Sequence, residues 1–324
     1  MPARRAKKYD DIDFEENQPK SMQEYLEWGF VKPPAGLMDV PPETARRRKE
    51  IMEREGDGCV ASCGCALEPT PFHMFGTVHA EVEADPDDLP LVSVVVPTYP
   101  QRHAYHALTL ASFRCQKYAN LELIVLDTGG ARSAAFDADD ASRDPRIRYY
   151  HDSADDLSLG QKRNRLVELA RGDIVCHFDD DNLYGPRYVE TLLPHLQHSL
   201  ADLVAVHGWW NYVADGDFIE RVPPDAVSDG KKARGESFFH RRKTSAGQPF
   251  AFPDLDLGED VAARVAAIHS VDDDIGLYFH VEHHANSSFR VIGRVVNLKG
   301  PAAKKPAEDL LALLAAHRPL LRGL

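Results

Sequence analysis

Ile174-Val175-Cys176-His177-Phe178-Asp179-Asp180-Asp181-Asn182 is the stretch that decides the fold of this chain. A short run of β-branched and aromatic residues that opens after Gly172 and closes at carboxylates is typical of a buried central strand. Because side chains alternate along a strand, Asp179 and Asp181 are expected on one face and Asp180 on the other. The stretch therefore predicts a central strand of a sheet with three acidic residues at its carboxyl end.

Neighbouring carboxylates repel each other, and a divalent cation would remove that repulsion. Hard oxygen ligands at a strand end suit Mg²⁺ or Mn²⁺ shared with the phosphates of a substrate. The alternative is an acidic turn that caps the following helix, which Asn182 and Pro186 could begin. We favour the metal because the preceding strand is so apolar.

Composition narrows the class of protein. The chain has 324 residues, of which 43% are hydrophobic, and its 38 basic and 51 acidic residues give a net charge of −13. This charge argues against a nucleic-acid partner. No apolar segment reaches the roughly 20 residues of a membrane span, and the N-terminus is charged, so we expect a cytoplasmic protein without an integral membrane segment. Cys59, Cys63 and Cys65 form a cluster that could bind zinc with His73, although free thiols are favoured.

The chain divides into three regions that differ in composition and in the motifs they carry. Residues 1–90 are expected to form an N-terminal extension with a disordered tail, a helix over 42–55 and a strand over 77–82. Residues 91–298 carry every chemical motif and are predicted to form the catalytic domain. Residues 299–324 form a leucine-rich amphipathic helix that is expected to pack on that domain.

Strands and helices alternate in the first half of the domain. Strands are predicted at 91–96, 121–126 and 146–150, and helices at 104–118 and 159–170. This alternation predicts an α/β fold with a mostly parallel sheet. Ligands of such sheets bind beyond the carboxyl ends of the strands. Thr98, Tyr99, Asp127 and the three aspartates should therefore share one crevice.

The second half of the domain is more mixed. Residues 203–212 and 218–221 are predicted to pair around a turn, residues 237–242 to form a strand, residues 252–269 a helix, and residues 275–281 a further strand. After the first strand the sequence reads Pro97-Thr98-Tyr99-Pro100-Gln101-Arg102, which lacks the glycines of a dinucleotide-binding loop. A sugar nucleotidyltransferase would also need a glycine-rich phosphate loop after its first strand. We therefore rank this function below the transfer of a sugar from a finished sugar nucleotide.

Several ordered motifs between Leu91 and Asn297 resemble family 2 of the nucleotide-sugar glycosyltransferases, which have the GT-A fold. The matching segments are Val94 to Tyr99 with Arg102, Gly160-x-Lys162-Arg163-Asn164, Asp179-Asp180-Asp181 as the Asp-x-Asp motif, Gly258-Glu259-Asp260, and His283-x-x-Asn286. One position departs from the pattern, because Asp127-Thr128-Gly129-Gly130 stands where relatives commonly carry Asp-Asp-Gly-Ser.

The resemblance implies a role for each matching residue. Asp260, with Glu259 as second choice, would be the general base of an inverting single displacement. Asp179, Asp181 and His283 would hold the metal, with His284 in reserve, and the imidazole favours Mn²⁺ over Mg²⁺. The residues implied in donor binding are Pro97, Thr98, Tyr99, Arg102, Asp127, Lys162, Arg163, Asp179 and Asp180. Without the resemblance, Glu259 and Asp260 would be interpreted as a helix cap. Lys162 and Arg163 are cations in the first turn of a helix and oppose its dipole, which indicates either a bound anion or, equally, solvated surface.

These observations predict a metal-dependent glycosyltransferase of the hexosyltransferase class. It would move a sugar from a nucleotide-sugar donor, favoured to be a UDP-sugar, to an acceptor that the sequence leaves open among glycans, small molecules, lipids and peptides. A sugar nucleotidyltransferase and a non-catalytic sugar-nucleotide or carbohydrate-binding module are the alternatives.

Overall fold

The computed structural model describes residues 89–154, 157–199, 201–224, 234–256, 259–260, 268–283, 286, 294–296 and 306–322. The predicted helix over 42–55, the strand over 77–82 and the cluster of Cys59, Cys63 and Cys65 lie outside these residues. His284 lies outside them as well. The division of the chain into three regions stays a prediction.

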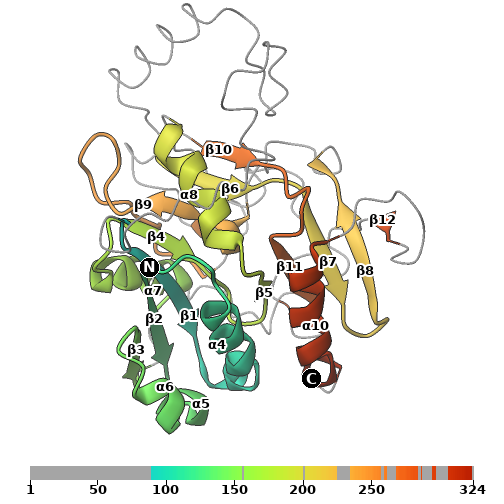
Figure 1. Cartoon of the computed structure of the whole chain (residues 1–324). Helices are drawn as coiled ribbons and strands as arrows, with labels where there is room; N and C mark the ends of the chain where they lie inside the picture. Colours follow the sequence, from blue (N-terminus) through green and yellow to red (C-terminus); the bar gives the residue numbers. More distant parts are fainter. Residues whose placement is uncertain are drawn as a thin grey trace, which may run out of the picture.

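A seven-stranded sheet forms the larger half of the molecule (Figure 1), in the order β10-β6-β9-β4-β1-β2-β3. Its strands are β1 (Val92–Thr98), β2 (Leu121–Thr128), β3 (Ile147–Asp152), β4 (Ile174–His177), β6 (Leu203–Val206), β9 (Phe239–Arg241) and β10 (Ile268–Val271). The pairs β1-β2, β1-β4, β2-β3 and β6-β10 are parallel. Only β9 runs antiparallel to its neighbours β4 and β6. The predicted α/β class with a mostly parallel sheet is confirmed.

A second sheet lies beside the first, in the order β12-β8-β7-β11-β5. Its strands are β5 (Leu183–Tyr184), β7 (Trp209–Val213), β8 (Phe218–Val222), β11 (Tyr278–Glu282) and β12 (Arg294–Val295). The short strand β5 follows the three aspartates and pairs with β11. The acidic motif is therefore the segment through which the chain passes from one sheet to the other.

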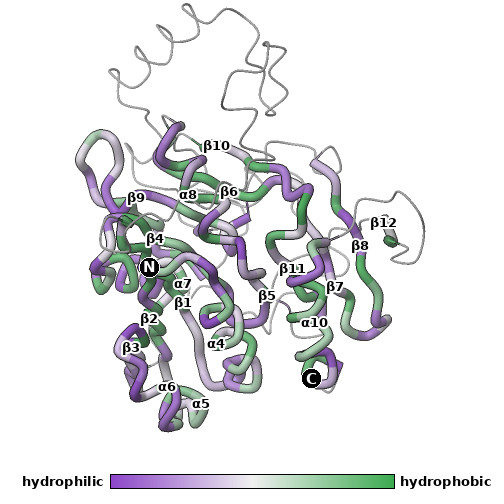
Figure 2. Tube along the Cα trace, viewed as in Figure 1, coloured by the Kyte–Doolittle hydropathy of each residue, from purple (hydrophilic) through white to green (hydrophobic). Residues whose placement is uncertain are grey.

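Helices cover both faces of the large sheet, and one helix packs on the small sheet. They are η3 (Pro100–Tyr105), α4 (His106–Arg114), α5 (Ala134–Asp137), α6 (Asp139–Ser142), α7 (Leu159–Leu169), α8 (Tyr188–His198), η5 (Gly235–Ser237) and α10 (Glu308–Leu321). Val94 packs with α4 and α8 in one core, and Val95 packs with α7 in another, as strand alternation requires. α10 packs against the small sheet through Leu310 and Leu314. Hydrophobic residues follow the interior strands, whereas the loop after β9 is hydrophilic (Figure 2).

Three sequence predictions are wrong in detail. Residues 203–212 form two strands in different sheets, because Gly208 takes a φ of +90° between them and a Cβ there would collide with Asp272. The β7–β8 hairpin is present as predicted. His269 belongs to β10 rather than to a helix end. The helix over 104–118 is shorter, because η3 precedes it and α4 ends at Arg114.

No helix within the described residues is long and apolar enough to cross a membrane. The cytoplasmic location stays a prediction.

Candidate active site

The carboxyl ends of the three central strands meet at one edge of the large sheet. Thr98 at the end of β1 pairs in register with Asp127 at the end of β2. On the other side of β1, Val95 pairs with His177, the last residue of β4, and the three aspartates follow almost at once. The expected gathering of functional groups at this edge is therefore present.

Asp127 is a buried carboxylate with one oxygen engaged and one available. Its Oδ2 lies 2.8 Å from Nε2 of His103 and accepts a short hydrogen bond from the hydroxyl of Tyr149. Its Oδ1 is buried and has no hydrogen-bond partner among the described residues. A buried carboxylate oxygen without a donor is costly, so this atom is well suited to accept an N–H group from a ligand.

Asp180 faces the interior of the domain. Its Oδ2 accepts a hydrogen bond of 2.6 Å from Thr98, whose hydroxyl lies 2.8 Å from Nε2 of His106. Nδ1 of His106 lies 2.6 Å from the hydroxyl of Ser133. Burial, together with the charge of Asp181, raises the pKa of Asp180 to about 8. Asp180 is thus an anchored group that fixes the direction of its two neighbours.

Asp181 meets His283 at the end of β11. Oδ2 of Asp181 lies 3.1 Å from Nε2 of His283 and also pairs with Arg102. Burial works against ionisation, but the charge of Arg102 and the bond to His283 hold the pKa of Asp181 well below its usual range. The hydroxyl of Tyr105 lies 3.1 Å from Nδ1 of His283, and the two rings stack at 4.8 Å. A partner on Nδ1 directs the other ring nitrogen, Nε2, towards the acidic motif.

Asp179 is joined to the predicted base segment through Arg163. The guanidinium of Arg163 donates from Nη2 to Oδ1 of Asp179 at 3.3 Å and from Nε to Oε1 of Glu259 at 3.0 Å. Burial and the charge of Asp260 raise the pKa of Glu259 to about 7. Oδ2 of Asp260 accepts a hydrogen bond of 3.0 Å from the backbone N–H of Gly235. These contacts bring Glu259 to the acidic motif and tie Asp260 to η5.

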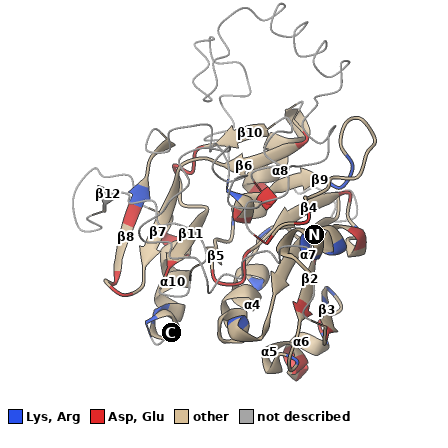
Figure 3. Ribbon diagram, turned by 180° about the vertical axis from the view of Figure 1, so that it is seen from behind, with Lys and Arg blue, Asp and Glu red and all other residues tan. Residues whose placement is uncertain are grey.

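Lys162 and Arg163 are not solvated surface. Both are buried on α7, which carries several basic residues (Figure 3). Nζ of Lys162 lies 5.6 Å from the centre of the Tyr99 ring, and Arg102 lies 5.8 Å from the same ring. Tyr99 is itself 38% exposed, so its ring presents an open aromatic face between two cations. Pro97 lies buried within β1.

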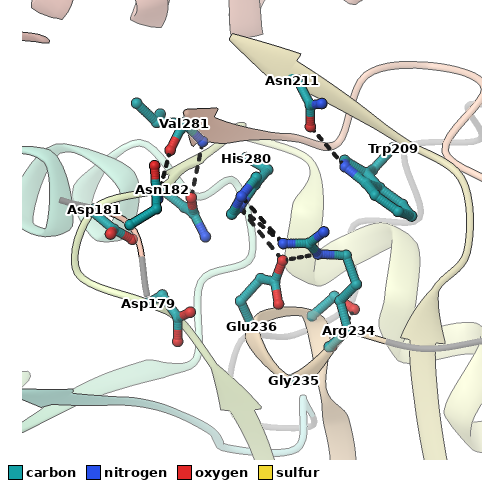
Figure 4. A network of polar contacts seen from close by, with 12 residues as sticks. Asp179, Asp181, Asn182, Trp209, Asn211, Arg234, Gly235, Glu236, His280 and Val281 are labelled. Atoms are coloured by element: carbon teal, nitrogen blue, oxygen red, sulfur yellow. Dashed lines mark hydrogen bonds and ion pairs between the residues drawn. The ribbon is translucent and has the colours of Figure 1, made fainter. Parts of the chain in front are cut away.

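A second group of charges, missed by sequence reasoning, lies across from the acidic motif (Figure 4). Glu236 accepts a hydrogen bond from Arg234 and lies 3.5 Å from Nδ1 of His280. The guanidinium of Arg234 covers the Trp209 ring at 4.6 Å. The charge of Glu236 adds to the burial that raises the pKa of Asp179 to about 6. The only sequence signal was the polar pair His280 and Glu282 within an otherwise apolar strand.

The fold and the buried acidic groups at the carboxyl ends of its parallel strands place the chain among the α/β proteins, whose ligands commonly bind at that edge of the sheet. Residues 93–253 match the family described as Glycosyl transferase family 2. Residues 93–253, just under half of the chain, belong to this family.

Curated relatives agree with that assignment. The putative glycosyltransferase EpsH of Bacillus subtilis is 32% identical over 107 residues, which cover 33% of this chain and 30% of EpsH. The putative colanic acid biosynthesis glycosyl transferase WcaA of Escherichia coli is 26% identical over 168 residues, covering 50% of this chain and 57% of WcaA. The chain thus spans less than two thirds of the length of these relatives.

Two solved structures are similar in part. S. aureus TarS 1-349 in complex with UDP has a TM-score of 0.48 and 16% identity, covering 59% of this chain and 60% of that one. The mannosyltransferase PcManGT of Pyrobaculum calidifontis, in complex with GDP-Man and Mn²⁺, has a TM-score of 0.44 and 18% identity, covering 62% and 59%.

Proposed function

We propose that the chain is a metal-dependent, inverting glycosyltransferase that moves a sugar from a nucleotide-sugar donor, a UDP-sugar in our proposal, to an acceptor hydroxyl. One observation carries this proposal. A base-binding carboxylate (Asp127), an acid with a histidine (Asp181 with His283) and a second pair of acids (Glu259 with Asp260) are linked to one edge of the sheet by the contacts described above.

The donor half of the site would lie over β1 and β2. The available Oδ1 of Asp127 would accept an N–H group of the base, and uracil offers one. Tyr99 would offer its exposed ring face, and Arg102 and Lys162 beside it would attract the diphosphate. These residues would bind the base and the diphosphate of the donor. The residues that would select the sugar lie elsewhere in the site.

The residues present fit a divalent cation at Asp181 and His283. A carboxylate oxygen and an imidazole nitrogen lie 3.1 Å apart, and the hydroxyl of Tyr105, 3.1 Å from the other nitrogen of His283, helps to orient the ring. Among the described residues, no three acid, histidine or cysteine side chains form a complete metal site, so Asp179 and the diphosphate would supply further ligands. When bound, Mn²⁺ or Mg²⁺ would offset the negative charge of the leaving diphosphate.

Asp260 would act as the general base. The acceptor oxygen attacks the anomeric carbon, its proton passes to Asp260, and the bond from the anomeric carbon to the diphosphate oxygen breaks with inversion. Glu259 is less suitable, because its side chain is only 5% exposed and is paired with Arg163. The hydrogen bond from Gly235 fixes one oxygen of Asp260 and helps to hold the carboxylate in place.

The test compares Asp260→Asn with the wild type on a panel of UDP- and GDP-sugars with and without Mn²⁺. We expect the wild type to release sugar and nucleoside diphosphate slowly without an acceptor. The variant should lose this activity, and transfer, while its nucleotide affinity stays within about threefold, because an amide cannot accept the proton. Asp254→Asn, an exposed carboxylate that contacts Gln161, is the matched control and should remain active.

Other outcomes would replace the proposal. Release of pyrophosphate from a nucleoside triphosphate and a sugar phosphate would identify a nucleotidyltransferase. Binding of sugar nucleotides with no turnover of any donor would identify a binding module. An active Asp260→Asn variant would remove Asp260 from the role of base.

A further inference from the structure

Arg163 holds three partners with three different nitrogens. Besides its bonds to Glu259 and Asp179, its Nη1 lies 3.1 Å from Nδ1 of His177. Its side chain is 3% exposed, and its guanidinium carbon lies 5.8 Å from the centre of the Phe252 ring. The orientation of this one side chain therefore sets where the two carboxylates lie relative to each other.

The third contact continues into the sheet as a directional chain. A guanidinium can only donate, so Nδ1 of His177 accepts and the proton of this ring is on Nε2. Nε2 of His177 lies 2.9 Å from Nε2 of His240, which must accept in turn. The proton of His240 is then on Nδ1, 2.7 Å from the backbone carbonyl oxygen of Arg241, to which it donates. Each tautomer is thus determined by its neighbours.

Both rings are fixed in place by packing. His177 ends β4, and His240 lies on the antiparallel neighbour β9. Their ring centres lie 5.1 Å apart, with the two nitrogens facing each other, and Phe250 stacks on the His240 ring at 3.9 Å. Neither residue has any exposed surface. Burial lowers the pKa of His240 to about 4, so this ring is neutral near pH 7.

Apolar side chains at positions 177 and 240 would satisfy the packing of this region, where the neighbours are Phe238, Phe250 and Phe252. Two imidazoles have a desolvation cost that apolar side chains would not have. What they add is an acceptor at one fixed point for Nη1 of Arg163.

We propose that His177 and His240 are positioning residues, which hold the guanidinium of Arg163 in the orientation that serves Glu259 and Asp179 together. The effect on catalysis rests on the proposed function, because it acts through the distance between the base segment and the acidic motif. Neither histidine has exposed surface with which to contact a substrate. Without an acceptor at position 240, the Nε2–H group of His177 would be buried and unpaired, so the ring would turn or carry its proton on Nδ1. Either change removes the acceptor of Arg163 Nη1, and the guanidinium would turn away from at least one carboxylate.

The experiment compares His240→Phe with His240→Gln, since the Gln side chain can place an amide oxygen near the position of Nε2. His195→Phe is the matched control, because His195 and His269 form another hydrogen-bonded histidine pair, with nitrogens 3.2 Å apart, between α8 and β10. Crystal structures of the variants would give the two Arg163 distances. Kinetics would give kcat and the KM for the donor.

In His240→Phe we expect Arg163 to leave Glu259 or Asp179, with kcat reduced about tenfold to 100-fold and KM within about threefold. His240→Gln should restore both distances and most of kcat, and His195→Phe should change neither. A structural role alone would lower stability in the Phe variant without moving Arg163, and that result would overturn the inference. Failure of His240→Gln to recover the contacts would overturn it as well.

If His240→Phe does not fold, His240→Asn provides the same comparison, because the shorter amide cannot reach the Nε2 position. Arg163 contacts as intact in His240→Asn as in His240→Gln would contradict the inference. A wild type that turns over no donor, combined with Arg163 displaced only in the Phe or Asn variant, would end the proposed function and leave the positioning role standing.

Discussion

Asp127→Asn should weaken nucleotide binding while leaving the fold intact. The hydroxyl of Tyr149 donates to Oδ2 of Asp127, so the oxygen of the new amide should take that position. Its NH₂ group would then replace Oδ1, the buried oxygen for which the described residues offer no donor. A donor would face the N–H group of the base where an acceptor stood before.

The magnitude follows from the bond that is lost. A hydrogen bond to a charged acceptor contributes about 1.5 to 3 kcal/mol, and about 1.4 kcal/mol corresponds to a tenfold change in Kd. The Kd for UDP should therefore rise between about tenfold and 150-fold. The free energy of unfolding without ligand should stay within about 1 kcal/mol of the wild type, because the variant also removes a buried charge.

Isothermal titration calorimetry with UDP and with GDP would measure the affinity, and urea denaturation would measure stability. Asp137→Asn is the matched control, because Asp137 is an exposed carboxylate paired with Arg132 near the same edge. A folded Asp127→Asn variant that binds UDP within twofold of the wild type would refute base recognition by Asp127. A preference for GDP in the wild type would correct the proposed donor.

Three further outcomes are expected. Tyr105→Phe removes the partner of His283 Nδ1 and should weaken Mn²⁺ binding about tenfold in calorimetry, and unchanged affinity would argue against His283 as a ligand. Asp273→Ala leaves the buried N–H groups of Gly276 and Leu277 without their acceptor and should lower the free energy of unfolding by about 2 to 4 kcal/mol in urea. A loss below about 1 kcal/mol would contradict that anchor. Burial lowers the pKa of His106 to about 3 and that of His240 to about 4, so unfolded chains bind protons below about pH 6.5 that the folded protein does not. Each histidine should therefore lower the free energy of unfolding by up to about 1.4 kcal/mol per unit as the pH falls, whereas the raised pKa values of Asp180 and Glu259 act in the opposite direction. Urea denaturation of the wild type and of His240→Gln isolates one histidine, and a difference in stability between them that is constant from about pH 6.5 to 4.5 would contradict this.

The sequence predicted the edge of the sheet because its signals are local. An apolar run followed by acids marks both a strand and its carboxyl end, and this held for Thr98, Asp127 and Asp179. The parallel order of β1, β2 and β4 follows from alternating strands and helices. No knowledge of distant contacts was needed for these predictions.

The residues of the site that the sequence did not predict are brought together by contacts between distant segments, which no local sequence pattern encodes. His177 and His240 are 63 residues apart and meet only because β9 enters the sheet antiparallel between β4 and β6. The same holds for Glu236, which lies just before the predicted strand over 237–242. A histidine inside the apolar run at 174–178 was the one visible signal, and its partner could not be chosen from the sequence.

Strand β9 and the turn before it position several residues of the proposed site, in addition to joining β4 and β6 in the sheet. It brings His240 to His177, and the η5 turn before it provides the N–H of Gly235 that holds Asp260. The hydroxyl of Tyr184 accepts a hydrogen bond of 2.9 Å from the N–H of Asp179 and donates one of 2.8 Å to the carbonyl of Glu236 in the same turn. A shift of this segment would thus move the base, Arg163 and the acidic motif together. Substitutions that alter the acceptor side without loss of turnover should therefore be found outside residues 234–241, where these shared contacts are absent.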